Sequence, residues 1–161
     1  MISIDSWVEG GAVAAALLAL VVRLRGMKKY IIAALFASLF TDFYFTLATQ
    51  VFHWWDYHGG ILKEVGLSFS YPDVIIPIAA MFVVRYWPHD RKSQALWGLA
   101  WSGALTGFDY FCANYTTLME FKNGFTWYYD VFLWAANLLA WYVFYRWFVE
   151  RRLNFVSRKL D

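Results

Sequence analysis

Four aspartates lie within or at the edges of long apolar stretches of this sequence: Asp42, Asp73, Asp109 and Asp130. No Lys or Arg stands in the interior of those stretches to neutralise them. A carboxyl group inside a bilayer costs at least about 2.5–3.5 kcal/mol on insertion scales, so it indicates a functional site by default. Such groups can hold a proton, a metal ion or an organic cation.

The aspartates are expected at graded depths below one face of the membrane. With a rise of 1.5 Å per residue, Asp42 lies about 15 Å and Asp109 about 13 Å from the outer ends of their helices. By the same rise per residue, Asp130 lies about 7 Å below the outer surface, and Asp73 is nearly at that surface. We therefore expect Asp42 and Asp109 to meet in one water-accessible cavity that opens to the outer side.

Polar and aromatic residues recur at helical spacing beside these carboxyl groups, and such residues are expected to face a helix bundle rather than lipid. Aromatic walls would add cation–π attraction for a bound cation. The alternative is that each aspartate is protonated or hydrogen-bonded to Ser, Thr, Asn or Tyr as a structural element. The predicted ligand- or ion-binding residues are Ser38, Asp42, Asp73, Thr106, Asp109, Asp130, Trp134 and Asn137.

A second candidate site lies in the segment HWWDYHGG, where His53, Asp56 and His58 follow the second apolar stretch. Imidazole and carboxylate groups are ligands for zinc and other transition metals. Their spacing matches no established metal motif, and His and Asp are common at membrane interfaces without a metal. The sequence identifies no cofactor and carries no GxSxG, HExxH, phosphate-loop or dinucleotide motif, so we expect a protein that is not an enzyme.

Composition places these residues in a membrane protein. Apolar residues make up 61% of the 161 residues and charged residues only 16%, against about 45–50% and 25% in soluble domains. The aromatic share of 22% excludes a disordered chain. The net charge of +2 gives no indication of nucleic-acid binding, and the expected partner is the lipid bilayer, in a plasma membrane that we expect to be bacterial.

The predicted fold class is all-α, a single polytopic membrane domain with five transmembrane helices. A helix needs about 17–25 predominantly apolar residues to cross a bilayer. The first and third stretches are short for a full span, and Pro77 is expected to kink the third. The predicted spans are residues 7–22, 30–52, 71–87, 95–118 and 125–148, followed by a basic tail at 149–161.

The basic residues set the predicted orientation. With five spans, all but Lys63 and Lys122 of the 14 Lys and Arg residues fall on one side. The positive-inside rule then places the N-terminus outside and the C-terminus in the cytoplasm. The N-terminal stretch carries Asp5 and Glu9 where a signal peptide would be basic, so we expect an uncleaved first helix.

Two helix faces carry small residues at a spacing of four. The fourth apolar stretch has Gly98, Ser102 and Thr106 at this spacing beside the pair Gly103 and Gly107, and the first stretch has Gly11, Ala15 and Ala19 on one face. Small residues let helices approach closely in lipid. These faces are expected to pack within the chain, with a homodimer interface as the alternative.

Several segments resemble a family of small multi-span membrane proteins from spore-forming Firmicutes. They are KKYIIAALFASLFTDFYF, HWWDYH, the Pro-containing third stretch ending in RYWP, and NGFTWYYDVFLW. The resemblance covers about residues 25–151 and implies the multi-span topology, without assigning a reaction. The size and tryptophan content are also similar to those of the tryptophan-rich sensory proteins, whose proline-rich signature this sequence lacks.

Three functions remain as hypotheses. The first is binding or transport of a proton-coupled or cationic small ligand through the acidic, aromatic-lined cavity. The second is a non-catalytic accessory or sensory subunit that docks another membrane protein. The third is an enzyme acting on a lipid or quinone, for which the sequence offers no nucleophile–base pair.

Overall fold

A computed structural model describes residues 4–58 and 71–157, with the side chains of residues 57, 71 and 150–157 excepted. Within these residues the chain forms five α-helices, which confirms the all-α class. Lys63, Arg158 and Lys159 of the predicted charge pattern lie outside the described residues. The elements are α1 (Ile4–Val22), the 3₁₀ turn η1 (Met27–Tyr30), α2 (Ile31–Thr46), the π-helical turn η2 (Leu47–Val51), β1 (Trp55–Tyr57), α4 (Tyr71–Arg85), α5 (Arg91–Tyr115), β2 (Met119–Phe121) and α6 (Trp127–Ser157).

Each helix coincides with one predicted stretch, and local chemistry sets its ends. α4 ends at Arg85, shortly before Pro88, because the residue preceding a proline is disfavoured in helical geometry. α5 begins after Asp90, whose Oδ1 accepts a 2.9 Å hydrogen bond from the backbone N–H of Ser93. α6 continues to Ser157, so the predicted tail at 149–161 is helical over most of its length.

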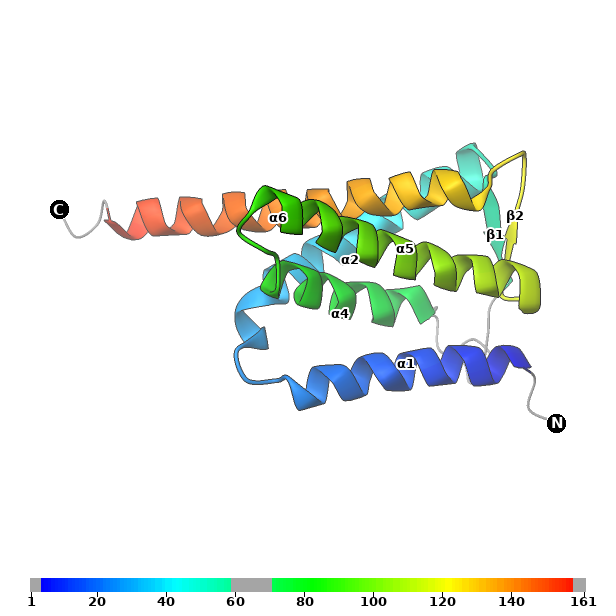
Figure 1. Cartoon of the computed structure of the whole chain (residues 1–161), viewed down its shortest axis with the longest axis horizontal. Helices are drawn as coiled ribbons and strands as arrows, with labels where there is room; N and C mark the ends of the chain where they lie inside the picture. The colour runs from blue at the N-terminus through cyan, green and yellow to red at the C-terminus, as the bar shows by residue number, and fades with distance from the viewer. Residues whose placement is uncertain (1–3, 59–70, 158–161) are drawn as a thin grey trace.

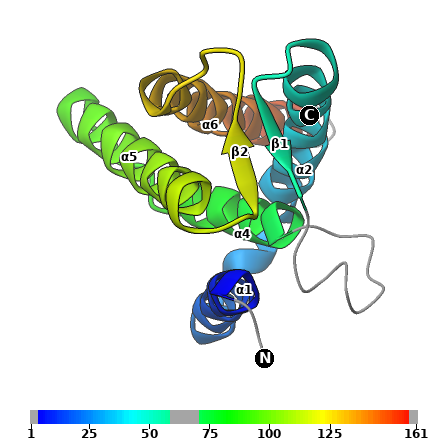
Figure 2. The same cartoon turned by 90° about the vertical axis from the view of Figure 1, so that its right-hand side faces the viewer.

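The helices run along one common axis in alternating directions, with the β1–β2 pair across one end (Figure 1). The view along this axis places α4 in the interior, next to α1, α2 and α6, while α5 packs mainly on α6 (Figure 2). The loops 23–29 and 86–90 lie at the end opposite the strands (Figure 1). α2 and α5 are therefore separated by α4 and α6.

The main core forms where α4 meets its neighbours. Ala33 and Ala37 on α2 and Ala80 on α4 are fully buried. Their small side chains allow the two helices to approach closely. Trp134 and Trp141 of α6 close this core, with ring centroids 6.3 Å apart in an edge-to-face arrangement.

The outer surface of the bundle is apolar, whereas several of its buried side chains are polar. On α1 the exposed side chains include Leu17, Leu18, Val21 and Val22. This distribution is the reverse of that in a water-soluble protein, where large apolar patches are rarely exposed. The buried polar side chains are Ser6, Glu9, Thr41, Ser102, Thr106, Asp109, Asp130 and Asn137.

Among the described residues, two helical segments are long and apolar enough to cross a membrane: Ile4–Val22 and Met27–Val51. α4 has only 15 residues, short of the roughly 20 that a bilayer requires. α5 and α6 are long enough, but both carry several Trp and Tyr residues and α5 carries three Gly, and hydropathy scales score these residue types as nearly polar. The helical bundle is confirmed, and the five spans stay a prediction.

The strand pair was not predicted from the sequence. β1 and β2 are antiparallel, with Trp55 opposite Phe121 and Tyr57 opposite Met119. Trp55 is buried against Phe125, with ring centroids 5.0 Å apart. Each strand has only three residues, too few for a periodic pattern to be recognised beside long helices.

The small residues Ser102 and Thr106 pack within the chain as expected, whereas the pair Gly103 and Gly107 and the face of α1 remain open. A Cβ atom added at Gly103 or Gly107 would meet nothing within 4 Å, and the same holds for Gly11. Ala15 and Ala19 are likewise exposed. α5 packs on α6 through Ser102, Thr106 and Asp109, which are buried, while Gly103 and Gly107 border a groove beside this contact.

Candidate functional site

The four aspartates separate into two pairs in different environments. Asp109 and Asp130 are buried between α5 and α6, with 6% and 2% of their surface exposed. Asp42 and Asp73 line an open groove between α2 and the start of α4. The two pairs offer different chemistry, because one is enclosed by protein and the other is reachable from solvent.

The buried pair is held by contacts across the α5–α6 interface. The indole Nε1 of Trp134 donates a 2.8 Å hydrogen bond to Oδ2 of Asp109. The carboxyl group of Asp130 is surrounded by Thr106, Asp109 and Trp134. Asp130 and Trp134 stand four residues apart on α6, so one helix turn presents both to Asp109.

Several buried oxygens around this pair have no hydrogen-bond partner among the described residues. They are Thr106 Oγ1, Asp130 Oδ2 and Asn137 Oδ1. The amide nitrogen of Asn137 is satisfied, because it donates to the backbone oxygen of Leu133 at 2.9 Å. In the described part of the chain no cationic side chain forms an ion pair with either carboxyl group. The cluster thus holds two buried carboxyl groups without a cationic partner among the described residues.

The open groove has a volume of about 460 Å³ and gathers three carboxylates, Asp42, Asp56 and Asp73, from α2, β1 and α4. Thr41 forms part of its wall, is only 3% exposed, and has a hydroxyl oxygen without a hydrogen-bond partner among the described residues. The complete lining is Thr41, Asp42, Phe45, Thr46, Thr49, Gln50, Asp56, Pro72 and Asp73.

Asp42 and Asp109, which were expected to share one cavity, lie in different environments. Asp42 is exposed in the groove, whereas Asp109 is buried against Trp134. Their depths along the helices are similar, but α4 and α6 lie between α2 and α5 (Figure 2). Ser38, one turn before Asp42, is half-buried and is not among the residues that line the groove.

Two of the three predicted metal-site residues, Asp56 and His58, lie beside charged side chains of the strand β2 and the residue that follows it. Lys122 Nζ donates a hydrogen bond to Asp56 Oδ2 and also lies 3.5 Å from Glu120 Oε2. This contact holds the pKa of Asp56 below its ordinary value and that of Lys122 above its own. In the described residues, His53, Asp56 and His58 do not form a group of three metal ligands. His58 faces Glu120 instead, with its Nε2 3.8 Å from Oε2.

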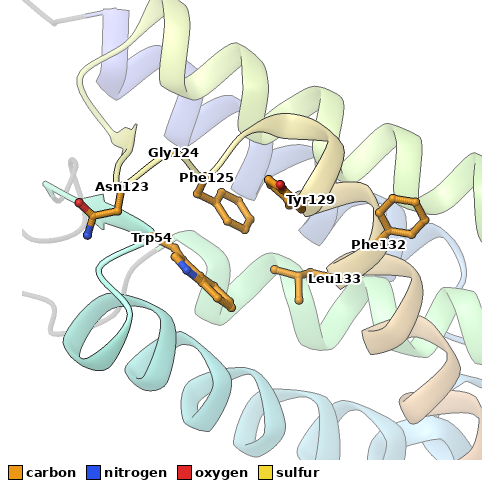
Figure 3. A pocket seen from close by; sticks show the side chains of 7 residues that line it. All are labelled: Trp54, Asn123, Gly124, Phe125, Tyr129, Phe132 and Leu133. Atoms are coloured by element: carbon orange, nitrogen blue, oxygen red, sulfur yellow. The ribbon is translucent and has the colours of Figure 1, made fainter.

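A third cavity is aromatic and lies where the strand pair meets α6. Its volume is about 360 Å³, and Figure 3 shows the side chains that line it. Trp54 forms one wall and stacks on Phe125, with ring centroids 5.4 Å apart. No lining residue is charged, so this cavity suits a hydrocarbon group rather than a cation. The lining residues are Trp54, Asn123, Gly124, Phe125, Tyr129, Phe132 and Leu133.

One residue of the groove and one buried carboxyl group outside it were not among the predicted site residues. Thr41 stands next to Asp42 and forms the buried wall of the groove. Glu9 is 1% exposed, and its Oε2 has no partner among the described residues. Its position between apolar residues and its spacing of three from Ser6, which is also buried, could have indicated that it faces the bundle.

Comparisons with known protein families, with curated proteins and with solved structures found no match for this chain. The resemblance to small membrane proteins of spore-forming Firmicutes therefore stays a prediction. Function has to be inferred from the geometry of the two acidic sites.

Proposed function

We propose that this chain is a small multi-pass membrane protein with five transmembrane helices that binds an organic cation from the outer side. The apolar exterior and polar interior of the bundle support the membrane placement. The alternating helix directions support five crossings, with a tilt or local thinning of the bilayer accommodating the short α4.

Charge supports the proposed orientation. The segment that carries Arg23 and Arg25 and the start of α5, with Arg91 and Lys92, lie at one end of the bundle, and the strand pair lies at the other (Figure 1). By the positive-inside rule the basic end faces the cytoplasm, in a plasma membrane that we take to be bacterial. The groove at Asp42 and Asp73 then opens toward the outer side.

The observation that carries the ligand class is the convergence of acceptor oxygens on this groove. Thr46 Oγ1 donates to the backbone oxygen of Asp42 and Thr49 Oγ1 to that of Phe45, both at 2.8 Å. Because the hydroxyl hydrogens of Thr46 and Thr49 are bonded to the backbone, these two side chains offer only oxygen lone pairs to a ligand in the groove. Together with the carboxylates Asp42 and Asp73, this lining favours a ligand that brings positive charge and N–H donors.

The size of the groove favours an organic cation over a bare metal ion. Divalent ions need several oxygen ligands at about 2.0–2.6 Å. Among the described residues no three acidic or histidine side chains approach closely enough for that. A volume of about 460 Å³ lies in the range of small-molecule sites, and Phe45 adds a ring for cation–π contact.

The test is a titration of the protein in lipid nanodiscs with putrescine, choline and calcium. We expect putrescine, which can span two carboxylates, to bind best and calcium worst. Asp42→Asn and Asp73→Asn should each weaken putrescine binding at least about tenfold. The matched control is Glu120→Gln, an exposed carboxylate outside the groove, which should bind normally. Equal affinity in both aspartate variants and the parent would overturn the proposal.

A second candidate, an accessory subunit that docks another membrane protein, is favoured by the exposed face of α1. Gly11, Ala15 and Ala19 are all exposed, and α1 packs mainly on α4. A partner helix could approach this small-residue face closely. Gly11→Leu should abolish co-purification of such a partner while leaving putrescine binding unchanged.

A further inference from the structure

A groove runs between α5 and α6 on the apolar outer face of the bundle. Its volume is about 460 Å³. Gly103 and Gly107 keep it open, because a Cβ atom at either position would meet nothing within 4 Å. The lining residues are Gly103, Thr106, Gly107, Tyr110, Trp127 and Val131.

The polar side chain of this groove is Thr106, which is 3% exposed and whose Oγ1 has no hydrogen-bond partner among the described residues. A buried hydroxyl without a partner costs about 1–3 kcal/mol. Asp130 lies next to Thr106, and its Oδ2 is likewise buried without a partner among those residues. Thr106 is therefore the polar side chain in the groove wall, and the carboxyl group of Asp130, which does not itself line the groove, lies next to it.

The walls of the groove are aromatic and face outward. Tyr110 and Trp127 are both exposed on the bundle surface. Aromatic rings offer a surface for a hydrocarbon chain and an electron-rich face for a cation. The groove thus combines an apolar wall with the polar side chain of Thr106.

We propose that this groove binds a membrane-dissolved primary amine with a long hydrocarbon chain. The ammonium group donates to Thr106 Oγ1 and toward the carboxyl of Asp130, while the chain lies over the two glycines. This inference rests on the membrane placement in the proposed function but concerns a different site from the groove at Asp42. A ligand in the bilayer reaches it laterally, without entering from the aqueous side.

Charge complementarity favours this occupant over a second copy of the chain. A neighbouring helix packed on Gly103 and Gly107 would cover the groove, yet the described span of α5 carries basic residues only at its start, Arg91 and Lys92. The donors along the rest of that helix are neutral, so it would bring no positive charge to the carboxyl group of Asp130 and would bury it further. An alkyl ammonium supplies both the charge and three N–H donors.

The test uses three probes with the same twelve-carbon chain, added to the full-length protein in nanodiscs and counted by native mass spectrometry. Dodecylamine is expected to bind at least about tenfold more tightly than dodecanol, which has one donor and no charge. Dodecyltrimethylammonium carries the charge without N–H donors and should also bind more weakly. Equal binding of all three probes would show partition into lipid only and would overturn the proposal.

Variants locate the site. Thr106→Val removes the hydroxyl at similar volume, and Gly107→Leu fills the groove; each should lower dodecylamine affinity at least about tenfold. The matched control is Gly98→Leu on the same helix, where an added Cβ also meets nothing within 4 Å but which does not line the groove. Normal binding by Gly107→Leu would overturn the proposal.

Two further outcomes separate this site from its alternatives. Loss of a dimer in Gly107→Leu, with no amine bound by the parent protein, would assign the groove to a second copy and overturn the proposal. Thr106→Val should leave putrescine binding at Asp42 and Asp73 unchanged, so failure of either site can be recognised by itself.

Discussion

The indole Nε1 of Trp134 donates a 2.8 Å hydrogen bond to Oδ2 of Asp109, joining α6 to α5 inside the bundle. This contact fixes the rotation of the two helices about their axes, because both side chains are buried and must face each other. It also places Asp130, one turn before Trp134, beside the same carboxyl group. The buried acidic pair therefore depends on an aromatic donor for its position.

Replacing this donor is expected to destabilise the protein. Trp134→Phe keeps an aromatic ring but leaves the Asp109 carboxyl without its N–H donor, at a cost of about 1–3 kcal/mol. Thermal unfolding in detergent measures the loss. Trp147→Phe, at an exposed position of the same helix, is the matched control and should be near neutral. Equal melting temperatures for the two variants would contradict the structural role of this bond.

The ion pair between Asp56 and Lys122 predicts a pH dependence. The folded-state pKa of Asp56 is lowered by the Lys122 hydrogen bond, so its stabilising effect is complete above its ordinary value of 3.8 and is lost as pH falls through the lowered pKa. The folded-state pKa of Lys122 is raised, so its contribution is complete below its ordinary value of 10.5 and is lost as pH rises through the raised pKa. Melting temperatures of the parent and Lys122→Met should differ between these limits and converge at both extremes. Because both groups are exposed, the difference should shrink in high salt.

Two glycines should respond in opposite directions to substitution by alanine. Gly124 has a φ of 75°, a conformation that L side chains rarely adopt, so Gly124→Ala should cost about 1 kcal/mol. Gly98 lies inside α5 with open space around it, so Gly98→Ala should stabilise by about 0.5–1 kcal/mol. Thermal unfolding compares the two directly, and the same sign for both would contradict the backbone geometry.

The proposed topology predicts opposite labelling of two single cysteines in a Cys112→Ala background. Glu120→Cys, in β2 at the end of the bundle that carries the strands, should react with an impermeant thiol reagent added to intact cells. Ser93→Cys at the start of α5 should react only after the membrane is permeabilised. Ser68, on the predicted outer side, would serve as a second outer position but lies outside the described residues. Labelling of both cysteines from one side would refute the five-span orientation.

The sequence by itself determined the helices and the depth of the carboxyl groups along them. Apolar stretches bounded by Gly, Pro and charged residues predict where helices form, because backbone hydrogen bonding and side-chain burial act locally. All five predicted stretches coincide with observed helices, and the buried polar residues Thr106, Asp109, Asp130 and Asn137 were singled out by their helical spacing.

Only the tertiary structure decided which carboxyl groups meet. The depth of a residue along a helix follows from its number. Which neighbouring helix its side chain faces depends on how the helices pack, and packing is set by the whole tertiary structure. Equal depth suggested that Asp42 would meet Asp109, yet α4 and α6 lie between their helices, so Asp109 meets Asp130 and Asp42 shares a groove with Asp73. The Asp56–Lys122 contact joins residues 66 positions apart, and the β1–β2 pair is a similarly long-range pairing, which no local pattern encodes.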